Sequence, residues 1–554
     1  MIMLVAAGSA HAQSQSTQEH VEAPTSNDAT ASGAPVLPDA PIAIDQLTLS
    51  DDLIGALGLR PIASGRIEAL ISAGNESTQH AALRATEKLG GVGFELTGNA
   101  LDSDALGTQT EVGARIEHAG ERNRLRLLGR YANEYVGLTR QAFESDLATT
   151  SYGGAWTGWR SAGRIELEAY GSHQTLRDTG SLASHELDAD AYAAHAGWSS
   201  RRVHAFGLDH AFGADIDITS SSSTTNQTDL SDEMQTNMQT LARTRRGRHR
   251  FLRAYIHDTI RVIESLDVHT GFVFEQWRWL TNIAPIYAQD FGEGMDVESA
   301  GSITDMVMGP QLGASYRVTP TVALQANAYR RLRTPTWQQL MRPVQNGDVL
   351  TVPSEELRPE TVTGGQFGPT IELGAIEARA VVFVHDIASP IVAVTSGPAL
   401  RETTNLDHAR EAGVDAEARW RIGKPWLAGI GYTFTDARVT AAAAHAQLVG
   451  NQLAQTPRHR ATALLAFDDP KLVTITGAVR YADRRFEDDR NMVVAPHYAV
   501  VDAMAARKLW HGLAGFVAVE NLFDRRYVAN QAGVETFSAP RLVQIGLRLD
   551  SARW

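Results

Sequence analysis

The sequence predicts an all-β fold: a 22-stranded antiparallel transmembrane β-barrel with short periplasmic turns and long extracellular loops. Three observations support this prediction. From about residue 65 onward, apolar and polar residues alternate with a period of two, which is typical of strands with two different faces. The polar face repeatedly carries Arg, Asp and Glu, which a dry core does not accept. The connections between candidate strands alternate between short and long, as they do when the two rims of a barrel face different compartments.

The alternation is clearest near the C-terminus. Val543, Ile545 and Leu547 fall on one side of a strand, and Gln544 and Arg548 fall on the other. The same pattern recurs in segments 124–131, 414–422, 426–434 and 473–481. A membrane-spanning helix needs roughly 20 consecutive apolar residues, and no segment approaches that length. A closed barrel is the other structure that satisfies every backbone polar group within a bilayer.

The connections between these strands fall into two groups. An even number of strands returns both chain ends to the rim with the short turns. A soluble propeller or sandwich array predicts a repeat of regular length instead, and the sequence has no such repeat. The short turns include Gly90-Gly91, 118–123, 160–163, 199–202, 318–321, 373–375, 423–425, 468–471 and 510–512. The long loops are expected at 213–249, 280–309, 334–361, 394–410, 437–457, 482–497 and 524–540.

The composition excludes several classes of function. The chain of 554 residues has a net charge of −14, which argues against a nucleic-acid partner, and it has no cysteine for disulfides, thiolate metal sites or nucleophiles. It contains no HExxH, GxSxG or P-loop motif. We therefore predict no catalytic residue, no cofactor and no metal site, and hence no enzyme. The carboxylates Glu487, Asp488 and Asp489 could hold a hard cation, but we interpret them as a solvated loop tip.

The N-terminal part of the chain precedes the predicted barrel. Residues 1–12 begin with apolar and small residues and end in Ala10-His11-Ala12, which is the form of a signal-peptidase site. Residues 13–64 include a stretch rich in Ser, Thr, Pro, Ala and Asp, and we expect them to be disordered or to thread the lumen. The barrel is assigned to residues 65–554.

Several stretches resemble TonB-dependent outer-membrane receptors, strongly from about residue 250 onward. Each stretch is short, but together they follow the order of the family. They are "RAYIHDTIRVIESLDVHTGFVFEQWRW" (253–279), "YRRLRTPTWQQL" (329–340), "EELRPETVTGGQFG" (355–368), "RETTNLDHAREAGVDAEARW" (401–420), "GYTFTDARV" (431–439), "QTPRHRATALLAF" (455–467), "VENLFDRRY" (519–527) and "APRLVQIGLRL" (539–549).

This resemblance implies a location in the outer membrane of a Gram-negative bacterium and uptake of a bulky nutrient of the siderophore, cobalamin or glycan class. It also implies a TonB partner and an N-terminal plug domain, but the sequence motifs of that plug are not found here. Two alternatives therefore stay open. One is a plug-less passive channel; the other is a non-transporting barrel that relies on a separate plug or lipoprotein.

Two sets of candidate binding residues lie in the predicted loops. Aromatic and basic side chains suit a bulky anionic ligand by stacking and by charge, and arginine guanidinium groups suit the phosphates of lipopolysaccharide. The expected ligand-binding residues are Tyr287, Phe291, Trp337, Arg342, Arg401, His408, Arg484 and Arg485. The expected lipopolysaccharide contacts are Arg243, Arg245, Arg246 and Arg248, in a basic run that continues to Arg250.

Overall fold

The computed structural model describes residue 62 and residues 64–138, 143–179, 183–229, 242–283, 299–346, 349–469, 471–530 and 536–551. The expected signal peptide, residues 1–12, lies outside the described residues. Of the segment 13–64, only residues 62 and 64 are described. Tyr287 and Phe291 also lie outside the described residues.

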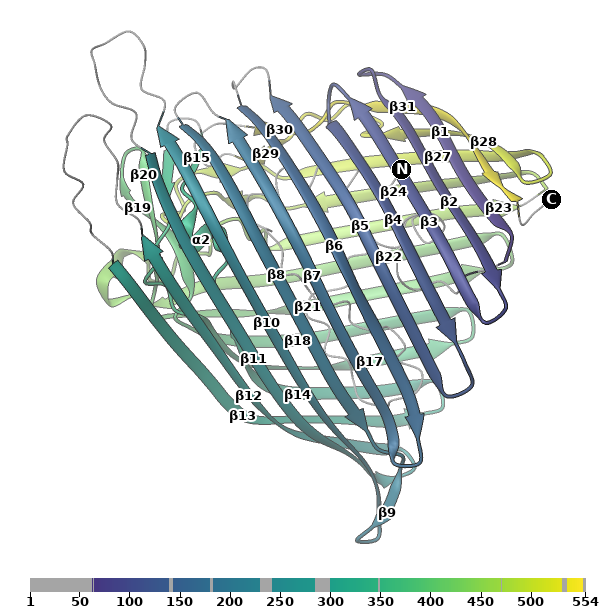
Figure 1. The fold of residues 1–554 in the computed structure, drawn as a ribbon, viewed down its shortest axis with the longest axis horizontal. Coiled ribbons are helices and arrows are strands. Elements are labelled where there is room, and N and C mark those ends of the chain that lie inside the picture. The colour runs from purple at the N-terminus through teal and green to yellow at the C-terminus, as the bar shows by residue number, and fades with distance from the viewer. Residues whose placement is uncertain are drawn as a thin grey trace.

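Twenty-two long strands form one closed antiparallel wall, as the sequence predicts (Figure 1). Each strand pairs with the next wall strand along the chain, and the last pairs with the first, for example Ala69 with Leu549. Closure leaves every wall strand with two neighbours, which is how a sheet crosses a bilayer without free edges.

The wall begins with β1 (Arg66–Gly74), β2 (Gln79–Leu89), β3 (Val92–Ser103), β4 (Gly107–Ala119), β5 (Asn123–Leu138), β6 (Phe143–Arg160), β7 (Gly163–Thr179), β8 (Ala183–Ser199), β10 (Leu208–Asp229), β11 (Ala242–Ile263) and β12 (Leu266–Ile283). It continues with β13 (Ser299–Thr319), β14 (Val322–Arg333), β17 (Glu360–Leu373), β18 (Ile376–Ala388), β21 (His408–Ile422), β22 (Trp426–Ala441), β23 (His459–Asp469), β24 (Val473–Ala482), β27 (Tyr498–Trp510), β28 (Leu513–Glu520) and β31 (Leu542–Asp550).

Shorter elements lie at the two rims. At the short-turn rim, β9 (Val203–Ala205) pairs with the start of β10 and projects below the barrel (Figure 1). At the long-loop rim, which we call the mouth, the loops contain α2 (Trp337–Met341), β15 (Val344–Asn346), β16 (Val349–Val352), β19 (Ile391–Gly397), β20 (Leu400–Asn405), η3 (Ala443–Leu448), β25 (Arg485–Phe486), β26 (Val494–Ala495), β29 (Val528–Asn530) and β30 (Thr536–Phe537). No helix in the described part of the chain is both long and apolar enough to cross a membrane.

The outer face of the wall is apolar, as the alternation predicts. Ile545 and Leu547 in β31 are 64% and 41% exposed, whereas their neighbour Gln544 is buried. In β22, Ile430 is 55% exposed and occupies the middle of an outward row that runs from Trp426 to Phe434. An exposed apolar belt of this kind is the surface that an outer-membrane barrel presents to lipid.

The inner face carries charges that are paired across neighbouring strands. Arg84 in β2 donates to Glu68 in β1 at 2.8 Å and to Glu95 in β3 at 2.9 Å. Arg115 in β4 donates to the same Glu95 carboxylate at 3.2 Å. All four side chains are buried. A buried charge is tolerated when it has partners of opposite sign, so this part of the polar face holds its charges as a ladder across four strands.

Two long loops expected from the sequence, at 213–249 and 280–309, are wrong. β10 and β11 pair continuously from Asp209 opposite Arg261 to Thr228 opposite Ala242, and β12 pairs with β13 as far as Ile283 opposite Ser299. The alternation of apolar outward residues stops before these strand ends, and for that reason the sequence predicts loops there. Outside the bilayer a strand needs its ladder hydrogen bonds but no apolar face, so the strands extend beyond the membrane.

The part of β13 nearest the mouth is paired on a single side. β13 pairs with β12 along residues 299–316, but it pairs with β14 only through residues 312–319. Residues 299–311 therefore have one strand neighbour among the described residues. Val307, in this stretch, is buried against Leu332 of β14 and Leu357 of the following loop. Apolar side chains of β14 and of this loop thus cover the stretch where β13 has no ladder with β14.

A charge on the lipid-facing belt should destabilise the barrel. Ile430→Arg is expected to lower the free energy of unfolding by about 2–4 kcal/mol, because it places a guanidinium near the middle of the apolar belt. Thr433→Arg is the matched control, because Thr433 faces the lumen, 3.5 Å from a carboxylate oxygen of Asp415. Urea-induced unfolding from lipid vesicles measures both. Equal losses in the two variants would contradict the assignment of the two faces.

Candidate functional site

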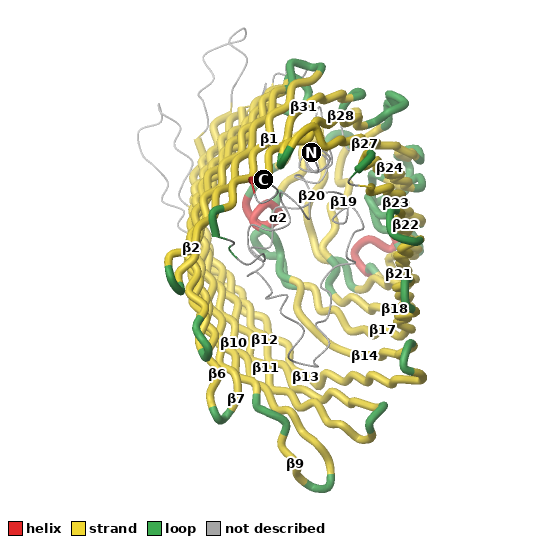
Figure 2. Tube along the Cα trace, turned by 90° about the vertical axis from the view of Figure 1, so that its right-hand side faces the viewer, coloured by secondary structure: helices red, strands yellow, loops and turns green. Residues whose placement is uncertain are grey.

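The loop that follows β14 folds back against the inner face of the wall. Thr336 caps α2: its hydroxyl accepts from the amide of Gln339, and the Gln339 side chain accepts from the amide of Thr336. This reciprocal pair is a strong signal for a helix start. Pro335 directly precedes the cap and cannot continue the ladder of β14. Figure 2 shows α2 on the inner side of the strands.

An apolar cluster holds α2 in place. Leu340 and Met341 of the helix are fully buried against Trp277 and Trp279 of β12. Gly247 of β11 permits this approach, because a Cβ there would lie 2.2 Å from the ring of Trp279 and 2.6 Å from Sδ of Met341. Burial of large apolar side chains stabilises by roughly 1.5–3 kcal/mol each. The loop is therefore a packed part of the barrel interior.

Another part of the mouth is built from loops that pack against one another. β15, β16, β20 and β19 form a separate four-stranded sheet that joins two loops. Within it, β16 and β20 are parallel, with Thr351 opposite Arg401. A parallel pair between different loops fixes their relative position through backbone hydrogen bonds. A further apolar cluster packs Val394 and Leu406 against Val439 and Leu448.

Three acidic residues close this assembly, and their interpretation as a solvated loop tip is wrong. Glu487, Asp488 and Asp489 are all buried. Asp488 accepts from the amides of Met492 and Val493 at 2.9 and 2.7 Å. Asp489 accepts from the amide of Thr395, in the neighbouring loop, at 3.1 Å. Backbone amides are strong partners for a carboxylate, so these acids stabilise the loops. A sequence pattern of acidic residues does not reveal such partners.

Two of the expected ligand-binding residues are held tightly by the protein itself. Trp337 packs edge-on against Trp279, with ring centroids 5.3 Å apart, and against His249. Arg342 pairs with the buried Asp178 of β7. Three wall strands, β8, β10 and β11, separate β7 from β12, against which α2 packs. Burial lowers the pKa of Arg342 to about 10, which leaves it charged at neutral pH beside that carboxylate. Both residues fasten the α2 loop to the wall.

Arg401 and Arg485 come together around Glu487. Arg401 donates to the backbone oxygen of Glu487 at 3.2 Å, and Arg485 pairs with its carboxylate at 2.7 Å. Arg485 also donates to the backbone oxygen of Ala529 in the last loop, at 2.6 Å. These contacts join three loops.

The remaining two expected residues are more accessible. His408, at the start of β21, is half-exposed and lies 3.6 Å from Asp386. The side chain of Arg484 is exposed, and the described residues provide it with no carboxylate partner. Of the described candidates, Arg484 is thus the cation most open to an anionic ligand at the mouth.

The basic run in β11 divides between the two faces of the wall. Arg245 points inward, where it donates to the backbone oxygen of Met341 at 3.1 Å. Arg246 and Arg248 lie on the opposite, outer face of β11, and both are exposed. Of Arg243 only the strand position is described, opposite Gln227. Arg278 is not predicted from the sequence as part of this basic group. It lies on β12, directly opposite Arg250 of β11.

One group of potential metal ligands lies on the outer face. Ligand atoms of His173, Asp188 and Asp190 lie within 4.8 Å of one another, on β7 and β8. His173 is hydrogen-bonded to Asp190 at 3.1 Å. Exposed acidic groups of this kind are common without a metal ion, and the group belongs to the outer surface and not to the mouth.

Comparison with known proteins identifies the barrel type. Residues 75–522 match the family model described as TonB dependent receptor-like, beta-barrel. The metal-pseudopaline receptor of Pseudomonas aeruginosa is 25% identical over 266 residues, which is 46% of this chain. The match spans 35% of that relative, well under two thirds of its length.

Solved structures share the fold at low sequence identity. The closed form of the ferric-catecholate import receptor of Escherichia coli matches with a TM-score of 0.73 and 14% identity, covering 89% of this chain and 82% of that one. The ferric yersiniabactin uptake receptor of Yersinia pestis gives 0.71 and 16%, covering 89% and 81%. A copper transporter gives 0.72 and 14%, covering 89% and 82%.

Removing one acidic partner should loosen two loops together. Asp489→Ala leaves the amide and hydroxyl of Thr395 without their acceptor, which costs about 1–3 kcal/mol. Hydrogen exchange should accelerate about tenfold or more in both 391–397 and 487–493. Asp386→Ala, which removes an exposed carboxylate, serves as the control and should leave both segments unchanged. Faster exchange in only one segment would argue against a joint assembly.

Proposed function

Because the chain belongs to the TonB-dependent receptor family through its β-barrel, we propose that it takes up a bulky metal chelate across the outer membrane. The observation that carries this proposal is the packed mouth. Loops that follow three wall strands, β18, β24 and β28, meet there and are tied together by Glu487, Asp489 and Arg485. A preorganised rim of this kind reduces the ordering cost of capturing a large ligand.

The charge at the mouth supports an anionic ligand. The guanidinium of Arg484 is exposed, and the exposed Arg490 donates to the backbone oxygen of Thr395 at 2.7 Å. Arginine recognises carboxylate and other planar anionic groups through paired donors. Ligands of the siderophore class carry such groups around the metal, which favours this class over uncharged glycans.

The similar proteins support the same choice. Their names mention metal-pseudopaline, ferric catecholates, ferric yersiniabactin and copper. All of these are metals or metal chelates. Cobalamin and glycans remain the other classes that the resemblance implies.

Transport of this kind needs no covalent chemistry from the barrel. The mouth captures the ligand, paired charges such as those of Arg84 and Glu95 keep the lumen wall polar, and energy reaches the receptor from the inner membrane through TonB. A passive channel would depend on none of that energy.

Uptake by the full-length protein in an outer membrane tests the proposal. Cells that carry the gene should accumulate a radiolabelled ferric chelate from a panel of ferric citrate, a ferric tris-catecholate and ferric hydroxamates. Cyanocobalamin and maltodextrins are the competing probes. A protonophore should abolish accumulation, because it removes the energy source. Uptake that survives the protonophore, together with a large steady current in planar bilayers, would favour a passive channel.

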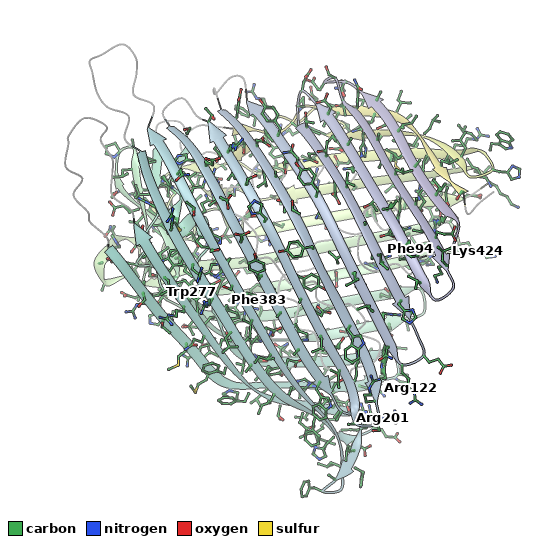
Figure 3. All side chains as sticks on the ribbon, viewed as in Figure 1. Phe94, Arg122, Arg201, Trp277, Phe383 and Lys424 are labelled. Carbon is green, nitrogen blue, oxygen red and sulfur yellow. The ribbon has the colours of Figure 1, made fainter. Side chains whose placement is uncertain are left out.

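The exposed arginine at the mouth provides a second test. Arg484→Ala should weaken binding of the transported chelate about tenfold, since an exposed charge-assisted contact contributes at the lower end of about 1.5–3 kcal/mol. Lys424→Ala removes a cation at the short-turn rim, where Figure 3 labels Lys424, and should leave affinity unchanged. Isothermal titration in detergent measures both variants. Equal affinities in the two variants would remove Arg484 from the binding site.

A further inference from the structure

Four arginines gather on the outer face of two neighbouring strands. Arg246, Arg248 and Arg250 alternate along β11, and β12 adds Arg278 opposite Arg250. All four side chains are exposed. Within the described ranges, none of them forms an ion pair with a carboxylate. We refer to these four residues as the arginine patch.

Two of these arginines face each other directly. Arg250 and Arg278 are cross-strand partners on the same face, and residues in such positions have Cβ atoms about 4.5–5.5 Å apart. Like charges directly opposite each other destabilise a sheet. An anion bound between the two guanidinium groups would offset this repulsion, so their position itself points to a ligand of negative charge.

Hydroxyl groups flank the arginine patch on the next strand. In the register of β10 with β11, Ser220 lies opposite Arg250, Ser222 opposite Arg248 and Thr224 opposite Arg246. The outward-facing carboxylates Asp188 and Asp190 lie one strand further away, on β8, opposite Thr224 and Ser222. That separation is roughly 10 Å. The patch therefore combines guanidinium and hydroxyl donors, which together suit a phosphate group.

The arginine patch begins where the apolar belt ends. On β11, the outward residues between Asp258 and Arg250 are Ile256, Ala254 and Leu252. Eight residues at about 3.3 Å each, tilted by about 40°, span about 20 Å, close to the thickness of such a belt. On β12, Phe272 lies in the same belt and Arg278 lies beyond it, toward the mouth. The patch thus lies at the level of the lipid headgroups of the outer leaflet.

We propose that the arginine patch binds the phosphate groups of lipopolysaccharide through Arg248, Arg250 and Arg278. The occupant follows from the charge and from the position: a phosphorylated lipid at the external surface whose acyl chains cover Ile256 and Phe272. Arg246 lies one step further from the belt and contacts the same headgroup. Arg245, although it belongs to the same basic run, is excluded because it bonds to α2 inside the barrel. This site does not depend on the transported ligand.

A triple variant tests the proposal on the full-length protein in detergent. Arg248→Gln, Arg250→Gln and Arg278→Gln together remove the charge and keep much of the side-chain volume. The matched control replaces Arg122, Arg201 and Arg202 by Gln; these arginines are exposed at the opposite rim, where Figure 3 labels Arg122 and Arg201. Native mass spectrometry and thermal shift on titration with lipopolysaccharide report the apparent affinity.

The triple variant should bind lipopolysaccharide at least about tenfold more weakly than the parent, whereas the control variant should stay within about twofold. Dephosphorylated lipopolysaccharide should bind the parent as weakly as intact lipopolysaccharide binds the triple variant. Unchanged affinity in the triple variant, or an equal loss in the control, would overturn the proposal. So would equally tight binding of phosphatidylglycerol, or full competition by millimolar inorganic phosphate. If the triple variant does not fold, the double variant of Arg250 and Arg278 decides by the same titration.

Discussion

The constraint on which the rest of this structure depends is the hydrogen bonding of the backbone within a bilayer. No water is available there, so each amide and carbonyl needs a protein partner. Twenty-two strands meet this demand by pairing in a closed ring, from β1 through β31 and back to β1. Closure in turn requires two faces of opposite character. The outward side chains contact lipid, and the inward side chains surround a space wide enough to need charges, loops or both.

The protein uses its inward charges mainly against one another. Along β1 to β4, Glu68, Arg84, Glu95 and Arg115 neutralise each other across strands. At the mouth, Arg342, Arg401 and Arg485 hold loops to the wall or to other loops. The arginine patch differs, because its guanidinium groups face outward. The same residue type therefore fastens the protein internally and presents positive charge to the membrane surface.

The sequence predicts the wall well, because a period of two is a direct consequence of strand geometry. Ile545 and Leu547 face outward as their alternation requires. The ends of β10 to β13 are not predicted, since their polar residues pair outside the bilayer, where no apolar face marks a strand. The mouth is predicted least. That Asp489 binds Thr395, or that Arg342 reaches Asp178, depends on how separate loops meet in space, and no local pattern in the sequence encodes those meetings. The resemblance to a family identifies the kind of rim but not its contacts.

The singly paired stretch of β13 links the mouth to the mechanics of the barrel. Where β13 has no ladder with β14, Val307 and Ile303 pack against the cluster that contains Leu340 and Leu357. Any ligand that displaces α2 therefore withdraws lateral support from this sector of the cylinder. A movement of the loop at the entrance would therefore reach the barrel wall through the apolar contacts of Val307 and Ile303.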